Sequence, residues 1–303
     1  MQTAILLLAL LAAEPLPAGD HIREIQFDGL QRSFVIHVPP KFPRPAPLVM
    51  AIHGAMMDAE TMAGFTGLSK KADAAGFVVV YPNGTGPAGL FLTWNAGGLR
   101  PSLAKTRPDD VGFLIRVLDE TAKELPIDSH RVYATGMSNG AMMCYRLAAE
   151  RADRIAAIAP VAGTMAIDNP KPKRPVPVIH FHGTHDGLVR FTGPDERVKK
   201  FMSYHSVDET IRAWIALDGC PLQPAVDALP DIDHDGLCVT RKVYGPGKDG
   251  AEVVLYVIDG GGHTWPGRKP GLGPIVRTIL GKSTEDISAN DLIWEFFQKY
   301  RLP

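Results

Sequence analysis

Hydrophobic residues along the chain form short continuous runs, which alternate with helical patterns. Runs of this kind cover residues 48–52, 77–81, 155–161, 176–182 and 253–258. They are typical of strands that are buried on both faces of a parallel sheet. Between them apolar residues recur every three or four positions, over 62–72 and 111–125 for example, which predicts crossover helices. The pattern therefore predicts an α/β fold with a mostly parallel central sheet flanked by helices.

Three further segments carry local signals of a hairpin or a helix. Segments 24–27 and 33–38 alternate like strands around Asp28-Gly29, which predicts a hairpin. Ser206 and Glu209 form a capping box that begins a helix through Trp214. A final helix is expected to face inward through Leu292, Ile293, Phe296, Phe297 and Tyr300. The sequence shows no internal repeat and no low-complexity linker, so we expect one domain over 19–303.

An apolar run at residues 4–13 is too short to span a bilayer but suits the core of a signal peptide. Small residues near Ala18 would allow cleavage, so residues 1–18 are interpreted as a signal peptide and the protein as secreted or periplasmic. No Lys or Arg precedes the run, which leaves a buried N-terminal segment as the alternative.

The composition is that of an ordinary globular protein. Of the 303 residues, 45% are hydrophobic and 21% are charged, and the formal net charge is −1. A neutral chain offers no electrostatic basis for binding nucleic acid or an anionic membrane. We therefore expect neither as a partner, and the sequence does not indicate an oligomeric state.

The chemistry of the chain is concentrated around residues 130–143, where a strand-like segment is followed by Gly136-Met137-Ser138-Asn139-Gly140 and a helical pattern. A nucleophilic serine must be exposed and fixed, and a sharp strand-to-helix turn supplies such a position. Glycine on both sides lets the strand and the helix approach without a clashing Cβ. Because the context matches, we interpret Ser138 as a candidate nucleophile.

A serine nucleophile needs an imidazole base and a carboxylate that orients it. In the α/β-hydrolase arrangement these follow the serine in the order acid, then histidine, each after a strand. Asp186 follows the run 176–182, and His263 follows the run 253–258 after three glycines. Asp259 competes as the acid but lies too close in sequence to His263. The predicted triad is Ser138, Asp186 and His263.

The oxyanion of an acyl intermediate needs backbone N–H donors. The first is expected from Asn139, directly after the nucleophile, and the second from Ala55 or Met56 in the loop after the run 48–52. We expect no cofactor.

Several other polar residues have structural explanations. Asp109 and Asp110 are interpreted as a cap and a dipole complement at the start of a helix. His182 and His185 near Asp186 lack a second ligand cluster, so no metal site is predicted. Residues 231–236 imitate the start of a calcium loop, but the twelfth position is Lys242 in place of Glu. A solvated turn is the preferred interpretation.

The three cysteines are Cys144, Cys220 and Cys238. Cys144 lies in the helix after the serine and is interpreted as a small core residue. Cys220 and Cys238 flank a loop rich in Pro and Asp, and in an exported protein they would pair. The sequence does not show whether the two are close together.

Six motifs together resemble the secreted polyhydroxybutyrate depolymerases and feruloyl esterases related to carbohydrate esterase family one. They are Val80-Tyr81-Pro82-Asn83-Gly84, Trp94-Asn95, residues 109–113, residues 136–140, residues 182–186 and residues 261–267. The resemblance begins near Phe27 and implies an α/β-hydrolase fold with the same triad. It also implies a disulfide near Cys220, with a partner whose position varies. Ala141 departs from the second glycine of many relatives.

The resemblance implies hydrolysis of carboxylic esters through an acyl-enzyme, with a small-molecule or polymeric ester as substrate. Trp94, Trp265 and His53 are candidate substrate-binding residues, against the alternatives of core packing for the tryptophans and an ordinary hydrogen-bonded role for His53. We expect a feruloyl esterase, because the chain has no spare length for a polymer-binding module. Alternatives are a polyester depolymerase, an acetyl-xylan esterase and, from another class, an inactive ligand-binding module. A peptidase is less favoured, since no propeller precedes the hydrolase segment.

Overall fold

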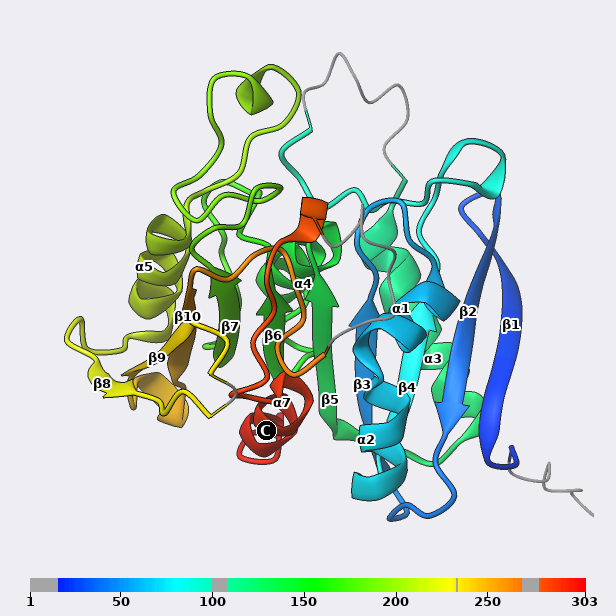
Figure 1. Cartoon of the computed structure of the whole chain (residues 1–303). Coiled ribbons are helices and arrows are strands. Elements are labelled where there is room, and N and C mark those ends of the chain that lie inside the picture. Colours follow the sequence, from blue (N-terminus) through cyan, green and yellow to red (C-terminus); the bar gives the residue numbers. More distant parts are fainter. Residues whose placement is uncertain (1–15, 100–107, 233, 269–277) are drawn as a thin grey trace, which may run out of the picture.

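One mixed sheet runs through the part of the chain that the computed structural model describes, which is residues 16–303 without 100–107, 233 and 269–277. Its ten strands lie in the order β1-β2-β4-β3-β5-β6-β7-β10-β9-β8 (Figure 1). The strands are β1 (Gly19–Phe27), β2 (Leu30–Val38), β3 (Ala46–Ile52), β4 (Val78–Pro82), β5 (Ile127–Met137), β6 (Ala157–Val161), β7 (Val178–Gly183), β8 (Ala225–Ala228), β9 (Cys238–Tyr244) and β10 (Val253–Asp259).

The six central strands, from β4 to β10 in that order, pair in parallel. The strands on both edges pair antiparallel. The predicted α/β fold with a mostly parallel sheet is confirmed. Strands β8 and β9 were not expected from the sequence, because β8 is exposed throughout and carries no apolar run.

Helices cover both faces of the sheet. The helices are α1 (Ala59–Thr66), α2 (Leu68–Ala75), α3 (Asp110–Glu124), α4 (Asn139–Glu150), α5 (Val207–Asp218) and α7 (Ala289–Phe297), with short 3-10 turns η1 (Pro87–Gly89), η2 (Val198–Lys200) and η3 (Lys248–Gly250). Helices α3, α4 and α5 pack into the core on one face, and α1, α2 and α7 pack on the other (Figure 1). None of the described helices has the length and apolar character needed to cross a bilayer.

Alternation along β3 shows how one strand serves both layers. Leu48, Met50 and Ile52 belong to the core on the face of α3 to α5, whereas Val49 and Ala51 belong to the opposite core. All seven residues of β3 are buried, which explains why the sequence shows a continuous apolar run in place of alternation.

Of the predictions for individual elements, two are confirmed and one is wrong. The hairpin of β1 and β2 and the capping box of Ser206 and Glu209 are confirmed. The single helix expected over 62–72 is wrong, because the structure has two helices there. Gly67 lies between them with φ 60°, and its N–H bonds to the carbonyl of Ala63, which ends α1.

The structure bears on the predictions for the two ends of the chain to different degrees. The interpretation of residues 1–18 as a signal peptide lies almost wholly outside the described residues, and β1 begins at Gly19. In α7 the side chains of Ile293, Phe296 and Phe297 are buried as expected, and Leu292 is only half-buried. Tyr300, expected in the same helix, lies beyond the end of α7 and is half-buried.

The parallel strands place their carboxyl ends at one edge of the sheet, the upper edge in Figure 1. Ser138 follows β5, Asp186 follows β7 and His263 follows β10. The loops after β3 and β4 reach the same edge. In open α/β sheets this edge is where ligands bind.

Candidate active site

Ser138 occupies a strained turn between β5 and α4. Its φ and ψ are 57° and −121°, which is unfavourable for a residue with a Cβ. Its N–H donates to the carbonyl of Val161 on the neighbouring strand β6, at 2.9 Å, which ties the turn to the sheet. The sharp turn expected at Ser138 is therefore present.

The glycines beside Ser138 are needed for close approach. A Cβ on Gly140 would lie 2.1 Å from the carbonyl oxygen of Ile52, and one on Gly136 would lie 2.6 Å from the carbonyl oxygen of Gly140. A third glycine, Gly163 after β6, packs against the turn, since its Cβ would lie 2.2 Å from the carbonyl oxygen of Ser138. The backbone of β3, β5 and α4 can meet at this point only because side chains are absent.

Asp186 lies in a tight turn after β7 with a buried carboxylate. One oxygen, Oδ1, accepts the backbone N–H groups of Leu188 and Val189 at 2.9 and 2.8 Å. The other, Oδ2, accepts Nδ1 of His263 at 2.7 Å. Burial on its own would raise the pKa of Asp186, but the hydrogen bond from His263 and the groups around it outweigh burial and lower the pKa below its usual value.

His263 is held by a backbone that only glycine allows. Its N–H donates to the carbonyl of Leu280 at 2.6 Å. A Cβ on Gly262 would lie 2.1 Å from that same carbonyl oxygen, and one on Gly183 would lie 2.2 Å from the carbonyl oxygen of Gly261. The expectation that this glycine run would position His263 fits these contacts.

The structure thus brings Asp186 and His263 into direct contact and places Ser138 at the same edge of the sheet. Because Asp186 is ionised, Nδ1 of His263 carries the proton and Nε2 is left as a base. Within the described residues no hydrogen bond joins the Ser138 hydroxyl to His263. Such bonds commonly tighten only when substrate is bound.

Two predicted oxyanion donors, the N–H groups of Asn139 and Ala55, have no hydrogen-bond partner in the part of the chain that the structure describes. Asn139 is the first residue of α4, so its N–H has no partner within the helix. The N–H of Ala55, in the turn after β3, has no hydrogen bond to another described residue. The Met56 N–H donates to the carbonyl of Leu92 at 2.7 Å, so the prediction of Met56 as an oxyanion donor is wrong.

Comparison with known proteins agrees with this geometry. Residues 68–173, which include Ser138, match the model of the prolyl oligopeptidase family. NocK of Nocardia uniformis subsp. tsuyamanensis, a protein named as an esterase, is 31% identical over 290 residues, which cover 90% of this chain and 81% of NocK. The chain belongs to the same family of α/β-hydrolase esterases as NocK.

More distant relatives match the resemblance noted in the sequence. Feruloyl esterase B of Piromyces equi is 29% identical over 242 residues, covering 77% of this chain and 42% of that protein. Poly(3-hydroxyalkanoate) depolymerase C of Paucimonas lemoignei is 28% identical over 275 residues, covering 78% of this chain and 59% of that protein. The esterase therefore spans less than two thirds of the length of each of these two relatives.

The structure of an acetyl xylan esterase from Aspergillus awamori superposes with a TM-score of 0.60 and 17% identity over 86% of this chain and 98% of that one. This likeness shows the shared fold. Together with the sequence relatives it confirms that the protein is an ester hydrolase with the serine hydrolase fold.

The three residues predicted to bind substrate in this esterase are buried, so that prediction is wrong. Trp94 and Trp265 are fully buried, and their indole N–H groups donate to the carbonyl of His53 and to Oδ1 of Asn290. His53 is also fully buried, and it bonds the carbonyl of Gly54 and the N–H of Gly84. All three join the loops at the sheet edge to the core, as structural residues would.

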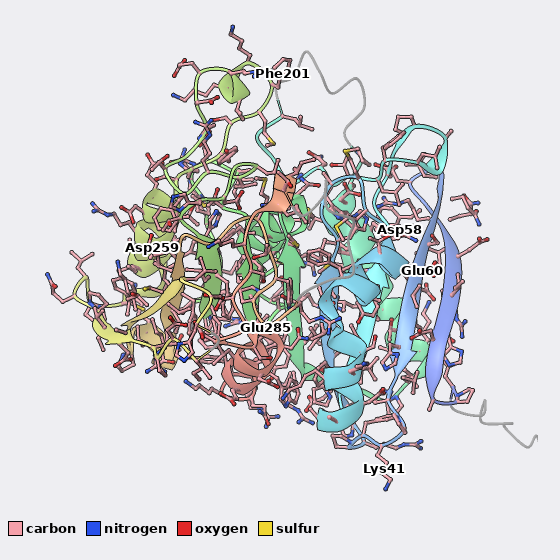
Figure 2. All side chains as sticks on the ribbon, in the orientation of Figure 1. Lys41, Asp58, Glu60, Phe201, Asp259 and Glu285 are labelled. Carbon is pink, nitrogen blue, oxygen red and sulfur yellow. The ribbon has the colours of Figure 1, made fainter. Side chains whose placement is uncertain are left out.

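Exposed apolar residues lie on the loops of this edge instead. The apolar rim, as we name this set, consists of Met56 after β3, Leu90 and Phe91 after β4, and Leu188 and Phe201 after β7. Figure 2 shows Phe201 at the top of the molecule, at the opposite end from Lys41. The sequence signal for these positions is weak, because isolated apolar residues in loops are common.

The predicted pairing of Cys220 with Cys238 is wrong, since all three cysteines are free thiols. Sγ of Cys220 contacts the carbonyl of Ala251, just before β10 begins, whereas Cys238 pairs with Asp259 at the other end of β10. The length of β10 separates them by about 20 Å at about 3.4 Å per residue. A disulfide requires Cα atoms within about 7 Å. Cys144 is a buried core residue as expected.

Asp110 has a role that the sequence did not reveal. Asp109 caps α3 as predicted, by accepting the N–H of Gly112. Asp110 is completely buried and pairs with the buried Arg32 at 2.8 Å, while its second oxygen accepts the N–H of Asn95 at 2.7 Å. Burial raises the pKa of Asp110 despite these partners. The pair joins β2, α3 and the loop that carries Trp94.

One acidic cluster lies in the region of the calcium-like motif. Carboxylate oxygens of Asp231, Asp235 and Asp286 lie within 4.8 Å of one another, while Asp233 falls outside the described residues. Two of these carboxylates bond backbone N–H groups, Asp235 that of Leu237 and Asp286 that of Ile232. These bonds fit the preferred interpretation of a turn.

Proposed function

We propose that the chain hydrolyses carboxylic esters through Ser138, His263 and Asp186 by way of an acyl-enzyme. The observation that carries the proposal is the buried 2.7 Å hydrogen bond from His263 to Asp186, at the same sheet edge as the strained turn of Ser138. A carboxylate that accepts from Nδ1 fixes the tautomer in which Nε2 is the base.

The steps follow from this arrangement. His263 Nε2 takes the hydroxyl proton of Ser138 as its oxygen attacks the ester carbonyl carbon. The N–H groups of Asn139 and Ala55 hold the oxyanion. The tetrahedral intermediate expels the alcohol, which takes the proton from His263. Water, deprotonated by His263, then attacks the acyl carbonyl carbon. The bond from that carbon to Oγ of Ser138 breaks, Oγ takes the proton back from His263, and the acid is released.

The substrate we propose is a hydroxycinnamoyl ester, with the feruloyl group as the representative acyl chain. Support comes from the relative named feruloyl esterase B and from the exposed aromatic rings of Phe91 and Phe201 in the apolar rim. A phenolic acyl group can stack on such rings, and a pair of aromatic rings contributes about 0.5–1.5 kcal/mol beyond burial.

A polyester such as poly(3-hydroxybutyrate) is the second candidate. The relative named as a depolymerase supports it, and so does the exposure of five apolar residues of the rim at one edge. An apolar polymer surface would cover such a rim, and burial stabilises by about 25 cal/mol per Å². Acetyl-xylan esterase remains a third alternative, on the fold shared with the structure of that name.

Turnover of methyl ferulate, p-nitrophenyl butyrate and poly(3-hydroxybutyrate) film separates these possibilities, with Ser138→Ala as the control. We expect wild-type turnover of methyl ferulate and a loss of several orders of magnitude in Ser138→Ala. Film clearing with poor turnover of methyl ferulate would favour the depolymerase. Binding without turnover, unaffected by a serine-directed phosphonate, would favour the inactive binding module.

Variants of the apolar rim test which acyl group the enzyme recognises. The double variant Phe91→Ala and Phe201→Ala should raise KM for methyl ferulate about tenfold and leave p-nitrophenyl acetate unchanged, because the acetyl group is too small to reach the rim. An increase in KM of equal size for both esters would contradict a role in acyl recognition. Leu222→Ala, an exposed apolar position away from these loops, is the matched control.

We also propose that the protein is exported, on the basis of the apolar run at 4–13. Expression of the full sequence followed by N-terminal sequencing of the protein outside the cytoplasm tests this. A start near Ala18 or Gly19 is expected, and retention in the cytoplasm with Met1 intact would contradict it.

A further inference from the structure

A chain of buried polar side chains runs from the helix layer to the carboxylate of Asp186. The hydroxyl of Tyr145 on α4 lies 2.8 Å from Nδ1 of His180, and Nε2 of His180 lies 3.1 Å from Nδ1 of His182. Nε2 of His182 lies 2.7 Å from the carbonyl oxygen of Val189. His180 and His182 alternate along β7 and so point to the same face of the sheet. Tyr145, His180 and His182 are all essentially fully buried.

The partners at the two ends fix every proton along this chain. A carbonyl oxygen only accepts, so Nε2 of His182 donates to Val189 and its Nδ1 is an acceptor. Nε2 of His180 must then donate to His182, and Nδ1 of His180 accepts from the Tyr145 hydroxyl. Burial lowers the pKa of both histidines, which keeps them neutral as this pattern requires. Each ring therefore has one defined tautomer.

The upper end of the chain meets the turn that carries Asp186. Nε2 of His182 lies 3.4 Å from Oδ2 of Asp186, the oxygen that accepts His263. The residue whose carbonyl it binds, Val189, donates its own N–H to Oδ1 of Asp186 at 2.8 Å. His182 therefore binds the turn 186–189 through the carbonyl of Val189, and the backbone N–H groups of the same turn bind the carboxylate of Asp186.

We propose that His182 is a positioning residue that fixes the carboxylate of Asp186 against His263. Its N–H secures the Asp186–Val189 turn, and the carbonyl of Val189, which can only accept, fixes the tautomer in which Nε2 carries that proton. The catalytic consequence rests on the proposed roles of Asp186 and His263. The structural consequence, an ordered Asp186–His263 hydrogen bond, does not depend on turnover.

Three variants test the proposal. His182→Leu removes the N–H, His182→Gln restores an amide N–H near the position of Nε2, and Tyr145→Phe removes a buried hydroxyl from the far end of the same chain. In His182→Leu we expect kcat for p-nitrophenyl butyrate to fall about 10²-fold with little change in KM, since a misplacement near 1 Å has that effect. His182→Gln should recover about tenfold. Tyr145→Phe should lower Tm by a few degrees, as His182→Leu does, with kcat within about twofold of wild type.

A proton NMR measurement gives a second readout that stability alone would not move. A histidine Nδ1–H held by a carboxylate gives a low-field signal, which is assigned to His263 by its loss in His263→Gln. We expect the signal in wild type and Tyr145→Phe, and its loss or broadening in His182→Leu. The proposal would be overturned if His182→Leu kept both the wild-type kcat and the signal. It would also be overturned if the wild-type spectrum lacked the signal, or if Tyr145→Phe lost as much kcat as His182→Leu.

Failure of the proposed function is recognised separately. If Ser138→Ala kept wild-type rates, the triad would be wrong, yet the signal in folded His182→Leu and Tyr145→Phe would still decide whether His182 positions Asp186.

Discussion

Asn139 acts twice in the proposed active site, through its backbone and through its side chain. Its N–H is the proposed donor to the oxyanion, while its side-chain Oδ1 accepts the hydroxyl of Thr93 at 2.9 Å and the N–H of Trp94 at 2.7 Å. Nδ2 also donates to the carbonyl of Trp94 at 3.3 Å. The side chain therefore ties the loop after β4 to the nucleophile turn.

Asn139→Ala keeps the backbone N–H and removes the side-chain bonds. Because the N–H of Trp94 is then left without its partner, we expect the free energy of unfolding to fall by about 1–3 kcal/mol. Thr93→Val, which removes only one of the bonds, should cost about 0.5–1.5 kcal/mol. Urea denaturation measures both. An Asn139→Ala protein as stable as wild type would contradict the assigned contacts.

Asp218, at the end of α5, is a buried carboxylate with incomplete hydrogen bonding. Oδ1 accepts the N–H of Val176 at 2.9 Å, and Oδ2 is buried without a hydrogen-bond partner among the described residues. Burial raises the pKa of Asp218 to about 7, against the opposing effects of Val176 and Arg174. The folded state thus holds a proton that the unfolded state loses near pH 4.

The raised pKa of Asp218 therefore adds to the free energy of unfolding in full below about pH 4, and this contribution is lost as the pH rises towards 7. Asp218→Asn cannot ionise, so it should be more stable than wild type by about 2–4 kcal/mol at pH 8 and about equal to wild type at pH 4. Denaturation at the two pH values measures the difference. A gain of the same size at both would show that Asp218 does not titrate in this way.

At the scale of elements, the crossing of β3, β5 and α4 decides where the nucleophile lies. A Cβ on Gly140 would lie 2.1 Å from the carbonyl oxygen of Ile52 and 2.5 Å from that of His53. Any side chain there must push α4 away from β3. Asn139 is the first residue of α4 and Ala55 lies in the turn after β3, so the displacement would also separate these two proposed oxyanion donors.

Gly140→Ala should therefore cost at least about 2–3 kcal/mol of stability and lower kcat. Gly64→Ala is the matched control, because Gly64 lies in the exposed middle of α1 and a Cβ added there would meet nothing within 4 Å. That change should stabilise by about 0.5–1 kcal/mol. Thermal unfolding and ester turnover measure both, and a harmless Gly140→Ala would contradict the crowding argument.

The sequence predicted the elements that have strong periodicity and the order of the site residues along the chain. Ser138, Asp186 and His263 could be found because parallel strands bring their carboxyl ends to one edge. Contacts between distant loops could not be found in this way. The bond from Met56 to Leu92 and the burial of Trp94 and Trp265 depend on which loops meet, and an exposed aromatic residue looks the same in sequence as a buried one.

The register of the strands could not be predicted from the sequence either. Cys220 and Cys238 flank one loop in the sequence, yet strand β9, which begins at Cys238, has only partial burial and no apolar run. Its antiparallel pairing with β10 places Cys238 beside Asp259, at the opposite end from Cys220. Asp110 is a similar case, because a buried pair with Arg32 needs β2 and α3 in contact, and nothing local signals it.

For the whole molecule, the buried histidines His53, His180 and His182 contribute to how stability depends on pH in acid. Burial lowers the pKa of His53 to about 4 and lowers those of His180 and His182 as well. Each histidine is neutral when folded and takes up a proton near pH 6.5 when unfolded. Their contribution is therefore complete above about pH 6.5 and is lost as the pH falls towards the folded pKa.

As the pH falls from 6.5 to 4.5, the three histidines give the free energy of unfolding a downward slope, which Asp218 and Asp110 oppose because their pKa values are raised. His53→Asn should reduce that slope by about 1.4 kcal/mol per unit, which is one proton. Urea denaturation across this range measures the slope. An unchanged slope in His53→Asn would contradict a buried neutral His53.

The central claim, that Ser138 is the nucleophile activated by His263 and Asp186, is tested most directly by trapping its covalent adduct. The protein is treated with a p-nitrophenyl phosphonate, and the adduct is located by mass spectrometry of its peptides. The account predicts one adduct per chain, on Ser138, with much slower labelling in His263→Gln and none in Ser138→Ala. Ester hydrolysis without an adduct on Ser138, or an adduct on another residue, would contradict it.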